Sequence, residues 1–133
     1  MLRLPVLLAL LAVMADDPIK VGFATLASFE FKDGMTLPKE VTDLDEKLVT
    51  IRGFMQREVP GGGPVNQFML VNESCGCNGT PKLPEVVFCT LPDGVTVDIK
   101  VSVATVTGKL FVGEVKEDGV VVMLYQMDAD SVQ

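Results

Sequence analysis

Residues 95–108 have the sequence VTVDIKVSVATVTG, and this stretch is the strongest sequence signal for the fold. Apolar side chains occupy the odd positions from Val95 to Val103, and polar side chains stand between them. This alternation is typical of a β-strand with one buried face and one wet face. The apolar positions then shift to even numbers at Ala104 and continue with Val106, which predicts a bend or a β-bulge there.

Short apolar segments on both sides of this stretch predict further strands. Residues 49–53 and 103–108 each carry a glycine within a β-branched run, as expected where barrel strands coil tightly. Residues 116–119 predict a hairpin turn, and the Gly-rich residues 60–64 predict a flexible hairpin loop rather than a phosphate site. The other predicted strands are residues 47–55, with Val49, Ile51, Gly53 and Met55 on one face, and residues 68–71, 85–91 and 120–127.

Two segments before residue 47 have weaker patterns. Residues 21–31 alternate briefly and are predicted to form a first strand or an extended arm. In residues 37–45 the leucines recur at helical spacing and Pro38 suits a first turn, which predicts a helix of about two turns. The carboxylates of Asp128 and Asp130 are expected on a frayed, solvated C-terminus.

Six short strands and one short helix predict a mainly β fold. Such a sheet buries its apolar faces by closing on itself or by packing on another sheet, and we expect a small closed or partly open antiparallel barrel of the OB-like type. The length of 133 residues allows one core, since single domains usually have about 100 to 150 residues.

The N-terminus has the pattern of a cleavable signal peptide. Residues 4–15 are continuously apolar, follow Arg3, and end in small side chains before Asp16. This run is shorter than the roughly 18 apolar residues that a membrane-spanning helix needs. We therefore predict a signal peptide over residues 1–15, one domain over residues 16–133, and a periplasmic or secreted protein that is at most peripheral to the membrane.

The charge and the residue types exclude several functions. The net charge is −7 and the basic residues are scattered, so the sequence lacks the basic patch that nucleic-acid binding requires. The chain contains no His, which excludes Ser-His-Asp and Cys-His catalysis and zinc sites that depend on His. We expect a protein that is not an enzyme and does not bind nucleic acid.

The three cysteines are the one unusual cluster of reactive side chains. Cys75 and Cys77 lie in a polar loop and Cys89 lies in the strand that follows. A disulfide from either loop cysteine to Cys89 would stabilise the fold by about 3 kcal/mol through loop closure. The spare thiol also allows a redox exchange. Alternatively, the three thiolates would bind zinc or copper(I), with Met69 or Glu73 as a further ligand.

The order of the segments resembles DUF3299, an exported bacterial family of unknown function. The likeness covers residues 37–55, 67–71, the cysteine loop, and residues 84–87, 106–110 and 125–132. Members carry a Cys in the middle loop, followed by a His or a second Cys and then prolines, and this chain has Cys75, Cys77, Pro81 and Pro84 there. The lack of His departs from the His-containing members, so their metal role does not transfer directly.

The resemblance implies an envelope protein with an OB-like barrel and no enzymatic activity. It also implies an accessory role beside an ABC-type transporter, with some members in metal-responsive neighbourhoods. Our first hypothesis is a non-enzymatic periplasmic binding module that docks a protein partner, such as a transporter subunit, or a transition metal through Cys75, Cys77 and Cys89. The alternative is a structural or protein-interaction domain with a disulfide-stapled loop and no ligand.

Overall fold

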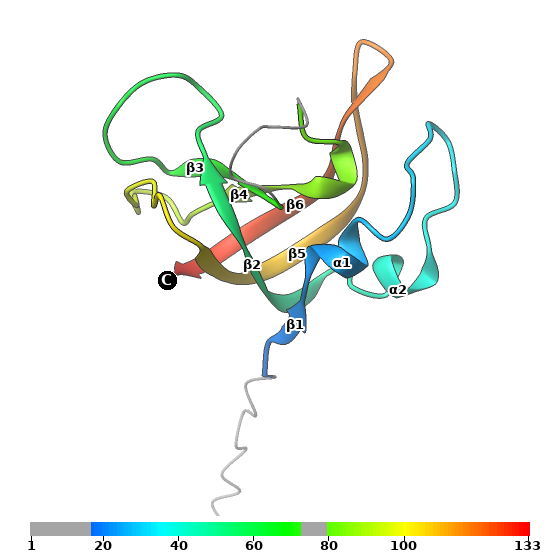
Figure 1. The fold of residues 1–133 in the computed structure, drawn as a ribbon, viewed down its shortest axis with the longest axis horizontal. Helices are drawn as coiled ribbons and strands as arrows, with labels where there is room; N and C mark the ends of the chain where they lie inside the picture. The colour runs from blue at the N-terminus through cyan, green and yellow to red at the C-terminus, as the bar shows by residue number, and fades with distance from the viewer. Residues whose placement is uncertain (1–16, 73–79) are drawn as a thin grey trace, which may run out of the picture.

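The computed structural model describes residues 17–72 and 80–133, and in these ranges the chain forms six strands and three short helical turns (Figure 1). No helix in the described ranges is both long enough and apolar enough to span a membrane. The helical turns are α1 (Phe23–Leu26), α2 (Lys39–Thr42) and the 3₁₀ turn η1 (Leu83–Glu85). The strands are β1 (Ile19–Val21), β2 (Lys47–Gln56), β3 (Gln67–Val71), β4 (Val86–Thr90), β5 (Ala104–Glu117) and β6 (Val120–Val132).

The strands pair in the order β1-β2-β3-β4-β6-β5, and β5 returns to pair with β2. β2 divides its length, pairing with β5 over residues 47–53 and with β3 over residues 54–56. This uneven ring confirms the predicted mainly β, partly open barrel, while the OB-like subtype stays a prediction. Four of the six strand pairings are antiparallel, as predicted, but β1 pairs with β2 and β4 with β6 in parallel, so the expectation of an antiparallel barrel needs correction at these two pairs. The long connection from β4 through β5 to β6 makes a parallel pair possible.

The core fills the inside of this ring. Val49, Ile51, Gly53 and Met55 are buried along β2, as predicted from their alternation. On β5 the buried positions are even-numbered, as the phase shift at Ala104 predicts. The glycines stand where strands approach closely, since a Cβ on Gly53 would lie 2.8 Å from the Val71 carbonyl oxygen and one on Gly108 would lie 2.7 Å from the Ala129 Cα.

The strand predicted over residues 95–103 is absent. The segment crosses from β4 to β5 as an irregular connection, drawn in yellow in Figure 1, with a single bridge between Val65 and Val97. Val97 and Ile99 pack against the core, but the side chain of Val101 is 99% exposed. The alternation gives the segment one apolar face, but β3 and β4 are already paired with other strands, so the described chain offers no full-length partner.

Three smaller predictions also need correction. Of the first strand or arm predicted over residues 21–31, only Val21 lies in a strand, at the end of β1. Phe23 and Leu26 bury one side of a helical turn instead. The predicted two-turn helix is a single turn, α2, and Glu46 then takes a positive φ of 61° while its N–H donates to the Leu110 carbonyl at 2.7 Å. The C-terminus is not frayed, since β6 stays paired with β5 as far as Val132, and Asp128 and Asp130 are exposed side chains of that strand.

Candidate functional site: a cleft beside η1

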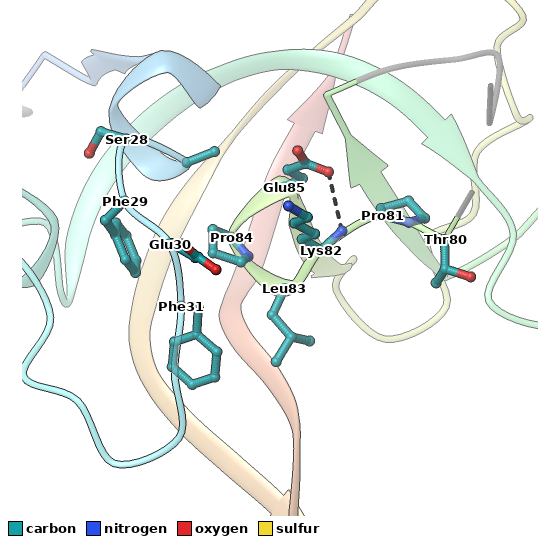
Figure 2. Close-up of a pocket in the computed structure, with 11 residues that line it drawn as sticks. Ser28, Phe29, Glu30, Phe31, Thr80, Pro81, Lys82, Leu83, Pro84 and Glu85 are labelled. Atoms are coloured by element: carbon teal, nitrogen blue, oxygen red, sulfur yellow. Dashed lines mark hydrogen bonds between the residues drawn. The ribbon is translucent and has the colours of Figure 1, made fainter. Parts of the chain in front are cut away.

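A cleft of about 740 Å³ lies between residues 27–31 and residues 80–85 (Figure 2). Its volume is within the range of ligand-binding pockets, about 300–1,000 Å³. Figure 2 shows Phe31 and Leu83 with side chains that point in the same direction from the two walls. The apolar lining side chains are Ala27, Phe29, Phe31, Pro81, Leu83 and Pro84, and the charged ones are Glu30, Lys82 and Glu85.

The first wall is held to the barrel by α1. Phe23 and Leu26 are buried, and the hydroxyl of Tyr125 in β6 donates to the Leu26 carbonyl oxygen at 2.7 Å. This hydrogen bond lies in the core, so it fixes the end of the helix from which residues 27–31 leave. The half-buried rings of Phe29 and Phe31 are thereby placed over the edge of the core.

The second wall is a tight turn that its own side chains stabilise. The Glu85 carboxylate accepts a hydrogen bond from the Lys82 N–H at 3.2 Å, and the Glu85 N–H donates to the Lys82 carbonyl at 2.8 Å (Figure 2). Pro84 is buried at the start of the turn, where the missing N–H of a proline costs nothing. The Asn72 N–H donates to the Glu85 carbonyl at 3.2 Å, which joins the turn to the end of β3.

The cleft combines large apolar side chains with backbone donors from residues 29–31. The side chains of Phe29, Phe31 and Leu83 remain partly open to water and are large enough to anchor a ligand. The backbone N–H groups of residues 29–31 donate to no backbone carbonyl in the described ranges. An extended peptide supplies both apolar side chains and carbonyl acceptors, so it matches both features.

Cys89 lies far from solvent in the barrel. It is fully buried in β4, between Phe68 of β3 and Met127 of β6 in the strand register, and its thiol donates to the Val87 carbonyl at 3.7 Å. Burial raises the pKa of this thiol, and the negative charge of Glu58 raises it further. The thiolate that metal binding or disulfide exchange requires is therefore strongly disfavoured at this position.

The other predicted ligands do not join Cys89 in the described ranges. Cys75, Cys77 and Glu73 lie outside them. Met69 is paired with Phe88 while Cys89 is paired with Phe68, so Met69 and Cys89 are on opposite faces of the sheet. Residues 17–72 and 80–133 contain no group of three His, Cys, Asp or Glu side chains that would hold a metal ion.

A second hollow, of about 400 Å³, lies on the outer face of β4, β5 and β6. Phe88, Gln126 and Phe111 stand in one cross-strand row there, and the Lys109 ammonium lies 5.5 Å from the centre of the Phe111 ring. Partial burial raises the pKa of Glu58 at its rim.

The cleft residues were not predicted from the sequence. Phe29 and Phe31 alternate with Glu30, and this pattern is too short to distinguish a ligand-binding arm from a strand. Pro81 and Pro84 mark a turn but carry no information about what packs opposite.

The fold is similar to that of a DUF3299 family protein from Pseudomonas aeruginosa PAO1, known from its crystal structure. The two structures superpose with a TM-score of 0.60 at 19% sequence identity, over 87% of this chain and 95% of the other. No protein-family model and no curated protein matches the sequence. The likeness therefore supports the predicted resemblance at the level of the fold.

Proposed function

We propose that this chain, which shares the fold of a DUF3299 family protein, is a non-enzymatic binding module of the cell envelope. In this proposal the cleft between residues 27–31 and 80–85 receives an extended apolar segment of a partner protein. The partner that the family resemblance implies is a subunit of an ABC-type transporter. The observation that carries the proposal is the pair of half-buried rings, Phe29 and Phe31, beside backbone N–H groups that donate to no backbone carbonyl of residues 17–72 and 80–133.

The residues around the cleft favour binding over catalysis. Ser28 and Thr80 bring hydroxyl groups to the cleft, but the sequence has no imidazole to activate them. The Glu85 carboxylate is used by the Lys82 N–H within the turn. In the described ranges no hydrogen bond joins either hydroxyl to Glu30, Lys82 or Glu85, so the lining residues show no paired nucleophile and base.

The described residues also favour a protein ligand over a metal ion. The burial of Cys89 and the raised pKa of its thiol argue against a three-thiolate site that includes it. The envelope location rests on the N-terminal sequence, where residues 4–15 and Asp16 have the pattern of a signal peptide and its cleavage point.

A peptide-display selection on the purified protein tests the proposal. We expect the enriched peptides to share two or three apolar side chains in an extended segment, with affinities measurable by fluorescence anisotropy. The Phe31→Glu variant should weaken binding at least about tenfold, which corresponds to about 1.4 kcal/mol, while Phe31→Leu keeps most of the affinity.

Phe111→Glu is the matched control, since Phe111 is also a half-buried aromatic residue but lies on the outer face of β5. It should leave peptide affinity unchanged. Equal loss in Phe31→Glu and Phe111→Glu would contradict the assignment of the cleft, as would a selection without enriched peptides. Tight stoichiometric binding of zinc or copper(I) to the same preparation would instead favour the metal hypothesis.

A further inference from the structure

Residues 95–103 combine the strongest strand pattern of the sequence with almost no strand structure. Val97 exchanges two backbone hydrogen bonds with Val65, at 2.8 and 2.9 Å, and holds the segment against the barrel. From residue 98 to residue 103, no backbone group is bonded to another backbone group of the described ranges. A segment with a high strand propensity and an unpaired backbone is a site at which another strand can be added.

The bridge at Val97 defines which edge of the segment is free. In an extended chain, successive residues direct their N–H and C=O groups to opposite edges, so the odd-numbered residues face Val65. The groups of the even-numbered residues then face away from the barrel. These residues are all exposed, and they are Thr96, Asp98, Lys100 and Ser102.

The sequence of this edge is complementary to itself. When two copies run antiparallel with Ile99 opposite Ile99, Asp98 of each copy stands opposite Lys100 of the other. In the same register Thr96 meets Ser102, and valines meet valines at the odd positions. The even-numbered pairs are the hydrogen-bonded ones in this register, which agrees with the edge that the Val65 bridge leaves free.

We propose that two copies of this chain form a symmetric dimer through antiparallel pairing of residues 95–103. Opposite charges that face each other across two strands stabilise the strand pair. The two-fold axis repeats the contact between Asp98 and Lys100, so the dimer contains it twice. Val101, which is 99% exposed in the single chain, then packs against Val97 of the second copy. The bend at residues 101–102 straightens as the strand extends towards β5.

Charge reversal gives a test that separates this interface from any other. In sedimentation velocity at about 100 μM, wild-type protein should be a dimer, and Asp98→Lys and Lys100→Asp should each be monomeric because like charges then face each other. The double variant D98K/K100D restores both opposite-charge pairs and should dimerise. The two single variants, mixed in equal amounts, should form a one-to-one heterodimer.

Asp33→Lys is the matched control, because it makes the same change in net charge at an exposed loop residue and should remain dimeric. Far-UV circular dichroism and thermal unfolding verify that each variant is folded. A monomeric wild type overturns the proposal, and so does a dimer that Asp98→Lys leaves intact. Failure of the mixed single variants to associate also overturns it. The peptide-binding cleft lies elsewhere, so either proposal can fail without the other.

Discussion

At the scale of single residues, two protic side chains are enclosed by the barrel. Tyr125 and Cys89 are both fully buried, and each donates to a backbone carbonyl, of Leu26 and of Val87 respectively. Burial raises the pKa of both groups. The hydrogen bond of Tyr125 and the raised pKa values of Tyr125 and Cys89 therefore depend on the closed core, and stability measurements can test them.

Tyr125→Phe should destabilise the protein by about 1–3 kcal/mol, because it removes the hydroxyl and leaves the Leu26 carbonyl buried without its donor. Chemical denaturation with urea measures this difference. Hydrogen exchange should also become faster in α1, which the lost bond anchors. An unchanged free energy of unfolding would mean that water replaces the hydroxyl.

Stability should fall at alkaline pH. Free cysteine and tyrosine ionise near pH 8.5 and 10, whereas the buried groups keep their protons to higher pH. Because the pKa values of Cys89 and Tyr125 are raised in the folded protein, both groups favour the folded state fully below their unfolded-state pKa. This stabilisation is lost as the pH rises from the unfolded-state pKa to the folded-state pKa. Each group should lower the free energy of unfolding by about 1.4 kcal/mol per pH unit above its unfolded pKa.

Urea denaturation between pH 7 and 11 under reducing conditions measures this dependence. Cys89→Ala should flatten the curve between about pH 8.5 and 10 and leave the later decrease in place. A curve with the same slope in the variant would show that Cys89 ionises normally in the folded protein.

At the scale of elements, neighbouring strands lie close to the backbone of two glycines. Gly53 marks the point where β2 leaves β5 and turns to β3, and Gly108 faces the backbone of β6 at a register shift. The sequence predicts tight coiling at both positions from a glycine within a β-branched run. The tight coiling at these glycines depends on the local sequence, so it could be predicted.

Gly108→Ala should destabilise the barrel by at least about 2 kcal/mol, because its Cβ would collide with the backbone of Asp128 and Ala129, which cannot rotate away. Gly113→Ala is the control on the same strand, since its Cβ would meet no atom within 4 Å. Thermal unfolding compares the two. Similar losses in both variants would indicate an effect of β-propensity instead of closure.

The predictions from the sequence also fail at the scale of elements. Residues 95–103 alternate as well as β2 does, but a strand needs a neighbour, and neighbours are set by the whole topology. The cleft could not be predicted for the same reason, because Phe31 and Leu83 are distant in sequence. The thiol cluster was inferred from the short spacing of the three cysteines along the sequence. That spacing does not reveal that Cys89 is buried.

At the scale of the whole molecule, the predicted export and signal-peptide cleavage can be measured directly. Expressed in a Gram-negative bacterium, the protein should be recovered by osmotic shock with a mass that corresponds to a chain starting near Asp16. Leu8→Arg, which interrupts the apolar run, should leave full-length protein in the cytoplasm. A full-length wild-type mass in the shock fluid would contradict cleavage.

The pairing order also has a consequence for how the chain is made. β6 is last along the sequence, and among the described strands it joins β4 to β5. The ring therefore closes only after β6 has left the ribosome, and two of its pairings, β2 with β5 and β4 with β6, join strands that are not consecutive in sequence, which slows folding. Late closure of the ring would suit the predicted export, because a chain that is still being synthesised has no closed barrel to unfold before translocation.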